Sequence, residues 1–307
     1  MRIATDFLTE KITAALLDAA ECGHLNGFSE CVIAENLHES DLSLKSVIEV
    51  AAQHGNLGQI PKSLLTPENL TKIGRLGTTP IHCTIINGHI RDVPNLETYL
   101  HIRNTDEISV LESAAWHRQL NKIPGLTPEH MLTKNPTTEG TPLHMAAMRG
   151  CLSQVPYMLS DQYMHEQDKS GNSPFLLAIT HDHEDQIPEE LFTAVNLMRI
   201  NDRGISNLAK VAENGLLGKI PKGLLTEENL LAPFGLVYKS YKPPSALATF
   251  FEVFEDRADE LLGIEITEKS RSIVGDVWYQ KNKEFLHKIK VEKESLATSD
   301  SYDVELF

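Results

Sequence analysis

The residues with the strongest apparent chemistry are the run HDHED, His181 to Asp185, whose side-chain types could ligate a metal ion. A metal site needs ligands that converge on one point and hydrogen bonds that orient them, and a single short run does not supply these. The four cysteines lack the paired spacing of a zinc site and the context of a nucleophile. They are Cys22, Cys31, Cys83 and Cys151. We expect reduced thiols, no metal, no cofactor and no catalytic residues.

Net charge and the lack of long apolar segments restrict which kinds of partner the chain is expected to bind. The 307 residues include 43 Asp plus Glu and 28 Lys plus Arg, for a formal net charge of −15. A chain this acidic is a poor candidate for binding nucleic acid, which requires a basic face, so a nucleic-acid partner is not expected. No segment approaches the ~20 apolar residues of a membrane span, and the N-terminus does not resemble a signal peptide. We expect a cytoplasmic protein, in the host cytoplasm if the chain is viral or from a pathogen, with oligomeric state left open.

The helices that would position any site are predicted from a pattern that repeats along the sequence. Prolines preceded by Ile or Val recur at intervals of 33, 30, 32, 32 and 33 residues. Six residues before each proline lies a fixed slot that most often holds glycine, and small residues, mostly alanines, come shortly before that slot. A period near 32 predicts stacked repeats. The prolines are Pro61, Pro94, Pro124, Pro156, Pro188 and Pro221, and the slots are Gly55, Gly88, Arg118, Gly150, Asp182 and Gly215.

Three segments carry a resemblance to a known family. GTPLHMAAMRG (140–150) closely resembles the ankyrin-repeat signature, GTTPIHCTIINGH (77–89) is a second good match, and GNSPFLLAITHDH (171–183) is a looser one. The resemblance covers roughly residues 10 to 236. It implies stacked helix-turn-helix pairs that serve as a binding scaffold and are not catalytic in themselves. His82 and His144 would be framework histidines held by hydrogen bonds.

The predicted fold class is all-α, an ankyrin-like helical solenoid of about seven repeats with a small C-terminal helical cap. A terminal repeat needs such a cap to cover its apolar face. Residues 237–295 are expected to form the cap or a separate helical module, and 296–307 an acidic flexible tail. The expected repeats span residues near 10–42, 43–76, 77–107, 108–139, 140–170, 171–203 and 204–236.

The second half of each repeat departs from the family. Proline inside a helix costs ~3 kcal/mol, so we expect a short second helix that starts at each proline, which then lies in its first turn. In LLTPENL, Thr66 is predicted to cap a further helical turn with Pro67 as its first residue. Thr127 and Thr193 repeat that pattern. The repeat around Pro124 is two residues short and is expected to be irregular.

The resemblance places the two residues after each alanine pair on a concave groove. In the middle repeats these include Trp116 beside Arg149, the composition of an interface hot spot. Alternatively, Trp116 tilts inward and fills a gap, or the loops at 135–140, 165–171 and 200–204 bind the partner. The predicted partner-binding residues are His54, Ile86, Asn87, Trp116, His117, Met148, Arg149 and His181.

The predicted function is a non-catalytic scaffold that binds a protein with a basic or apolar surface. One alternative is a phage or pathogen inhibitor or effector that sequesters a host or defence protein. Another is an ankyrin array that presents a small catalytic C-terminal domain, with Trp278, Tyr279 and His287 as the first residues to test.

Overall fold

The computed structural model of the chain describes residues 2–40, 44–202, 205–216 and 219–221. These residues form short helices joined by turns, and none of them belongs to an extended strand; three isolated antiparallel bridges pair Ser40 with Ser46, Arg103 with Ser109 and Ile200 with Ser206. No helix in the described ranges is long and apolar enough to cross a membrane. The chain divides into two compact units, Met1–Met158 and Leu159–Phe307.

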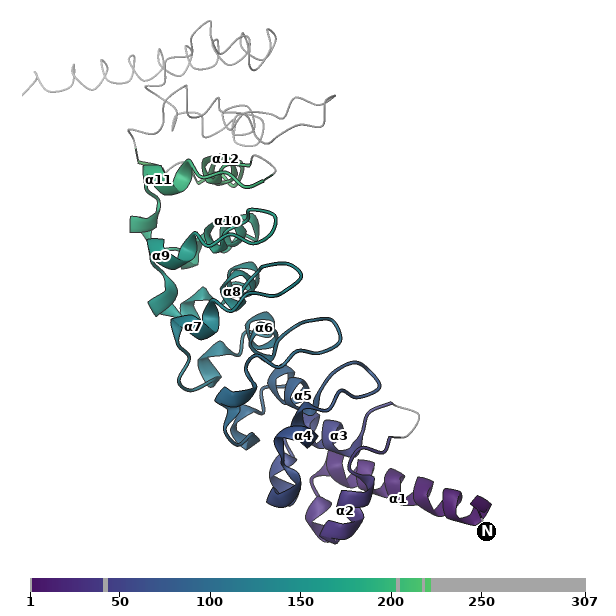
Figure 1. Cartoon of the computed structure of the whole chain (residues 1–307). Coiled ribbons are helices and arrows are strands. Elements are labelled where there is room, and N and C mark those ends of the chain that lie inside the picture. Colours follow the sequence, from purple (N-terminus) through teal and green to yellow (C-terminus); the bar gives the residue numbers. More distant parts are fainter. Residues whose placement is uncertain (1, 41–43, 203–204, 217–218, 222–307) are drawn as a thin grey trace, which may run out of the picture. The chain divides into compact units, whose positions relative to one another are not determined.

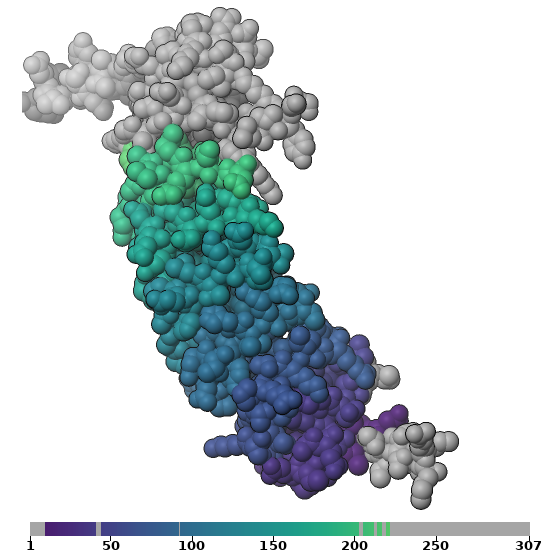
Figure 2. Space-filling view, in the orientation of Figure 1, coloured from purple at the N-terminus to yellow at the C-terminus, as the bar shows by residue number. Residues whose placement is uncertain are grey.

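The first unit stacks four repeats on an N-terminal helix pair (Figure 1). Helices α1, α3, α5, α6 and α8 contact one another in series, while α4 contacts α5 and α7 contacts α8. The space-filling view shows neighbouring repeats of this unit in direct contact (Figure 2). The helices are α1 (Arg2–Cys22), α2 (Glu30–Asn36), α3 (Val47–His54), α4 (Pro67–Thr71), α5 (Pro80–Ile86), α6 (Val110–Trp116), α7 (Pro128–Met131) and α8 (Pro142–Arg149).

Alanine pairs let these first helices approach closely. Ala51 and Ala52 in α3, and the corresponding pairs in α6 and α8, are fully buried. A methyl side chain adds little thickness between helices, so the larger apolar residues beside the pairs can interdigitate at the density of a protein interior. The predicted repeat register is therefore the register in which the helices stack.

Histidines complete the helix caps in two repeats. Thr79 and Thr141 precede Pro80 and Pro142, the first residues of α5 and α8. His82 Nδ1 lies 2.7 Å from Thr79 Oγ1, and its Nε2 lies 3.0 Å from the carbonyl oxygen of Ile108 in the next repeat. The predicted framework role is confirmed for His82. His144 likewise lies 2.8 Å from Thr141 Oγ1 through its Nδ1.

Glutamates take the same position in two other repeats. Ser46 and Glu49 form a capping box at the start of α3, and Ser109 and Glu112 form one at the start of α6. In this motif the acid accepts the backbone N–H of the capping serine three residues earlier. Both side chains are buried, with 1% of Glu49 and 4% of Glu112 exposed.

The fixed slot is left-handed in every described repeat. Its φ is positive at the glycines and also at Arg118 (56°) and Asp182 (60°). A side chain in this region costs roughly 1–2 kcal/mol, which explains why the slot favours glycine. The register prediction is confirmed even where the residue type departs from it. The glycines are Gly23, Gly55, Gly88, Gly150 and Gly215.

The predicted role of the prolines needs a correction. Pro61 has ψ 134° and precedes a single 3₁₀ turn, Lys62–Leu64, instead of starting an α-helix. A further 3₁₀ turn, Leu57–Gln59, lies before it. Only four residues lie between Pro61 and the next helix cap, Thr66, which leaves no room for a stable α-helical segment. In the first repeat Ser29 replaces the proline, and it holds the N-cap position of the seven-residue α-helix α2 without a side-chain cap hydrogen bond.

The predicted capped turn near the end of the second half is confirmed at Thr66, Thr127 and Thr193, whereas Ser160, before the helix Asp161–Met164, makes no side-chain cap hydrogen bond. Thr66 accepts a hydrogen bond from the backbone N–H of Asn69 at 3.3 Å, and Pro67 is the first residue of α4. Thr127 and Thr193 cap α7 and α11 in the same way. In the shorter repeat no 3₁₀ turn follows Pro124; a turn with left-handed Gly125 (φ 70°) takes its place, so the expected irregularity is confirmed.

The second unit continues the pattern in residues 159–221. Helix α10 contacts α9 and α12, and α12 contacts α11. Fully buried Phe175 packs edge-on against Phe192 at 5.4 Å between ring centroids. The predicted cap or module at 237–295 and the tail at 296–307 lie outside the described residues. The helices are α9 (Asp161–Met164), α10 (Pro174–Thr180), α11 (Ala194–Leu197) and α12 (Asn207–Glu213).

Candidate functional site

The predicted binding residues lie at the C-terminal ends of the first helices. Six of them, in three consecutive repeats of the first unit, define what we call the Trp116 surface. His54 is the exposed last residue of α3, and His181 is exposed directly after α10 in the second unit. The Trp116 surface comprises Ile86, Asn87, Trp116, His117, Met148 and Arg149.

Arg149 holds the central aromatic ring. Its Cζ lies 4.4 Å from the centroid of the Trp116 ring, which is a cation–π distance. The Nε of the same side chain donates a hydrogen bond of 3.2 Å to the backbone carbonyl of Trp116. The guanidinium therefore fixes both the ring and the end of α6.

A second arginine, from the repeat of Trp116, donates a hydrogen bond in the opposite direction. Arg118 Nε donates to the carbonyl of Arg149 at 2.7 Å, and Gln154 Nε2 donates to the carbonyl of Arg118 at 3.0 Å. The thiol of Cys151 lies 3.3 Å from the carbonyl of Ala115. The Arg149 carbonyl, at the C-terminal end of α8, is among those that a helix leaves without an intrahelical donor. The ends of α6 and α8 are thus joined by side chains from both repeats.

The charge of this surface is positive in an acidic chain. Burial and the neighbouring Arg149 both lower the pKa of His117, so the imidazole is neutral near pH 7. Arg118 and Arg149 supply the cationic groups. Burial raises the pKa of the Cys151 thiol to about 11, despite both arginines, which excludes a reactive thiolate here.

Trp116 does not fill a gap in the core. Its side chain is 42% exposed, and Ile86 and Met148 on the flanking repeats are partly exposed. The two residues before it, Ala114 and Ala115, are fully buried and make the inward contacts of α6. The observed exposure favours the surface orientation over the inward tilt.

The alternative binding loops are structured by their own side chains. Asn135, at the start of 135–140, is buried and donates to the backbone carbonyl of Glu107 at 2.8 Å and to Glu112 Oε1 at 3.0 Å. In 165–171, Asp168 Oδ1 accepts the backbone N–H groups of Ser170 and Asn172. Their polar residues thus serve in part to hold the turns.

The HDHED run is spread along a helix end and a turn. His181 follows α10, Asp182 takes the left-handed slot, and His183 precedes a 3₁₀ turn, Glu184–Gln186. Within the ranges that the structure describes, no group of three or more His, Cys, Asp or Glu side chains could hold a metal ion. The four cysteines are free, two of them exposed and two buried.

One exposed apolar group was missed by the sequence reasoning. Leu44, Ile73 and Leu76 are 41%, 50% and 48% exposed and belong to the loops on either side of α3 and α4. The available signal was Glu49 in the position where the resemblance has a histidine, because an acid buried there needs a partner that compensates its charge.

No protein-family model matches the chain, and no curated protein does. Among solved structures, the chain is similar to the ankyrin repeat domain of Bcl-3, described as a unique member of the IkappaB protein family. That similarity covers 63% of this chain and 91% of the other, at 16% identity and a TM-score of 0.48. The helix pairs, Thr-Pro-x-His caps and left-handed slots stand on this chain's own geometry. By its fold, the described chain is an ankyrin-like, all-α helical solenoid.

Proposed function

We propose that this protein is a non-catalytic scaffold that binds a partner protein through the Trp116 surface. The observation that carries the proposal is the 42% exposure of a tryptophan ring that an arginine from the next repeat holds in place. Exposed tryptophan and arginine in contact are typical of interface hot spots.

The geometry favours a protein partner with an apolar contact surface. Partly exposed Ile86 and Met148 flank the ring along the stack, so a partner can cover three repeats at once. Burial of such exposed apolar side chains against a partner removes apolar surface from water, which favours binding. Because Arg149 already restrains the ring, little side-chain entropy remains to be lost.

The described structure bears on neither of the two alternative functions, for different reasons. A phage or pathogen effector that sequesters a host protein would use the same surface chemistry, so the site does not distinguish it from an endogenous scaffold. The catalytic alternative rests on Trp278, Tyr279 and His287, which lie outside the described residues.

Affinity capture from the native host, followed by mass spectrometry, tests the proposal. The full chain should retain a protein that the Trp116→Ala variant loses. Tyr157→Ala is the matched control, because Tyr157 is an aromatic residue of equal exposure (43%) outside the Trp116 surface. Retention of the partner by both Trp116→Ala and Arg149→Glu, together with its loss from loop variants, would overturn the proposal.

A further inference from the structure

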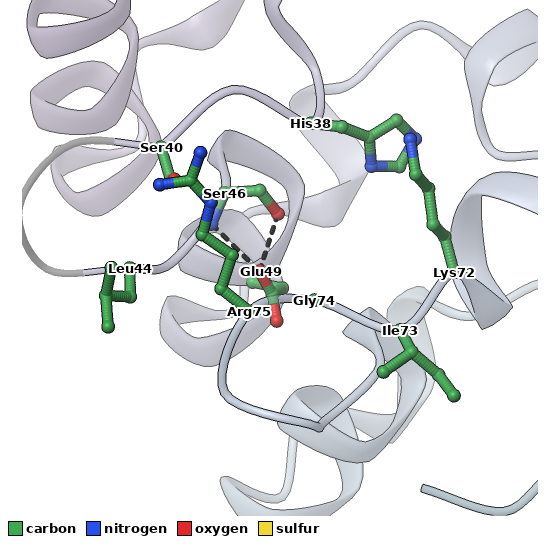
Figure 3. Close-up of a pocket in the computed structure, with 9 residues that line it drawn as sticks. All are labelled: His38, Ser40, Leu44, Ser46, Glu49, Lys72, Ile73, Gly74 and Arg75. Carbon is green, nitrogen blue, oxygen red and sulfur yellow. Dashed lines mark hydrogen bonds between the residues drawn. The ribbon is translucent and has the colours of Figure 1, made fainter. Parts of the chain in front are cut away.

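A pocket of about 160 Å³ opens beside the buried carboxylate of Glu49, at the end of α3 opposite to His54 (Figure 3). Its walls come from described residues before α3, from Glu49 within it, and from the segment that follows α4. The lining residues are His38, Ser40, Leu44, Ser46, Glu49, Lys72, Ile73, Gly74 and Arg75.

The Glu49 carboxylate is only partly satisfied. Its Oε2 accepts the backbone N–H of Ser46 at 2.8 Å and the Ser46 hydroxyl at 2.7 Å, as Figure 3 shows. Among the described residues, its Oε1 accepts one long hydrogen bond, 3.4 Å from the hydroxyl of Thr78. No ion pair to Glu49 forms within the described part of the chain. A carboxylate with 1% exposure and no cation is costly.

The corresponding carboxylate in another repeat has its cation. Glu112 Oε2 pairs with Arg103 Nη1 at 2.8 Å, and its Oε1 accepts the amide of Asn135 at 3.0 Å. The guanidinium of Arg103 also donates to the backbone carbonyls of Glu107 and Lys134. The charge of Glu112 is therefore fully compensated from within the chain.

The two repeats share one loop geometry. The bridge between Ser40 and Ser46 matches the bridge between Arg103 and Ser109, and the residues before the two serine caps repeat a left-handed position, Leu44 (φ 64°) and Glu107 (φ 60°). Ser40 thus stands where the other repeat has Arg103.

Gly74 stands in the same way where the other repeat has Asn135. Both residues donate their backbone N–H to the carbonyl of the residue before the next capping threonine. A Cβ on Gly74 would lie 2.2 Å from Glu49 Oε1, so the carboxylate lies directly against this glycine. The carboxylate therefore takes the place that the Asn135 side chain has in the other repeat, and the pocket, which Ser40 lines, lies where that repeat has the side chain of Arg103.

We propose that this pocket binds the guanidinium of an arginine side chain from a partner protein, with Glu49 as its counter-ion. Arginine is favoured over lysine because its planar group can donate to a carboxylate and to backbone carbonyls together, as Arg103 does. Leu44 and Ile73 line the pocket and give it two exposed apolar side chains for the aliphatic stem.

The cations on the rim act against an incoming arginine only weakly. Lys72 and Arg75 line the pocket but are exposed, so water screens their charges. Glu49 is fixed and buried, where its attraction is screened less. The pocket goes beyond the Trp116 surface, since it uses other residues at the other end of the helices.

The test is an NMR titration of the ¹⁵N-labelled full chain with two peptides, acetyl-Gly-Arg-Gly-amide and its citrulline analogue. Citrulline has the shape of arginine without its charge. The arginine peptide should shift the backbone amides of Ser46 and Gly74 and saturate, and the citrulline peptide should bind at least about tenfold more weakly. Glu49→Gln should weaken binding by a similar factor, because glutamine keeps the capping box and removes the charge.

The Ser40→Arg variant supplies the internal arginine of the other repeat, so it should abolish peptide binding and raise the melting temperature. Trp116→Ala should leave peptide binding unchanged, which separates this site from the proposed function. Equal binding of both peptides, or full binding by Ser40→Arg, would overturn the proposal. So would binding that appears only in Arg75→Ala, because the chain's own arginine would then occupy the pocket.

Discussion

The guanidinium of Arg149 lies 4.4 Å from the ring centroid of Trp116, a residue one repeat earlier in the chain. The same side chain donates to the Trp116 carbonyl. The contact crosses the boundary between two repeats, so the position of an exposed ring depends on how α6 and α8 stack. The Trp116 surface is for this reason a property of the array and not of one repeat.

A double-mutant cycle should detect this coupling. Trp116→Ala removes the ring and leaves the carbonyl bond, whereas Arg149→Ala removes both contacts. We expect a coupling free energy of about 0.5–1 kcal/mol, the range for cation–π pairs at exposed sites. Urea unfolding of the wild type, both single variants and the double variant measures it. Strictly additive effects would show that the stacked geometry contributes nothing to stability.

Gly55 and Gly58 offer a matched test of the left-handed slot. Gly55 has φ 75°, and a Cβ there would lie 2.6 Å from His89 Nδ1. Gly55→Ala should lower the free energy of unfolding by about 2 kcal/mol, from the backbone cost together with the displaced imidazole. Gly58→Ala has no atom within 4 Å of the new Cβ and should change the value by less than about 0.5 kcal/mol. Equal effects in a denaturant titration would contradict the explanation.

The repeat array was predictable because its signals are local. A proline after Thr141, an alanine pair and a residue in the slot each constrain a few neighbouring backbone angles, and each recurs. Even Arg118 and Asp182 were assigned to the slot by spacing alone. The second halves were harder, because a proline is compatible with a helix start and with an extended residue before a 3₁₀ turn. The five-residue distance from Pro61 to Thr66 decides between them.

The candidate sites likewise have features that sequence spacing could predict and features that it could not. The exposure of Trp116 followed from its place after the alanine pair. Its contact with Arg149, and the exchange with Arg118, depend on side-chain directions that spacing does not give. The Glu49 pocket could be recognised only by comparing the hydrogen-bond donors of two repeats. Arg103 corresponds to Ser40, and Asn135 corresponds to Gly74. Only the structure puts those donors around a carboxylate.

Stability should decrease under mild acid. Burial lowers the pKa of His82, even though the carbonyl of Ile108 and the charge of Glu112 act in the other direction. Its pKa is therefore lower in the folded than in the unfolded chain, and the unfolded chain takes up the proton first. The free energy of unfolding should fall as the pH drops below about 6.5, the unfolded value.

His82→Gln isolates this contribution, because glutamine retains the capping position and does not titrate. Its pH dependence, measured by urea unfolding between pH 7.5 and 5, should be shallower than that of the wild type. Some dependence will remain, since burial also lowers the pKa values of His101, His117 and His165. A variant with the full wild-type slope would show that His82 keeps its solution pKa.

The Arg103–Glu112 pair predicts what an uncompensated acid costs in this loop. Arg103→Ala leaves a 4%-exposed carboxylate with only Asn135 and the cap of Ser109 as partners. Because Arg103 itself is partly exposed, we expect a loss of roughly 2–4 kcal/mol, near the lower end for a broken buried pair. The double variant Arg103→Ala/Glu112→Gln should be more stable than Arg103→Ala alone, since the neutral amide keeps the cap without a buried charge. Denaturant unfolding of the three proteins gives the order. If the double variant is the less stable one, the carboxylate is compensated by other groups, and the cost assigned to the isolated charge of Glu49 would lose its support.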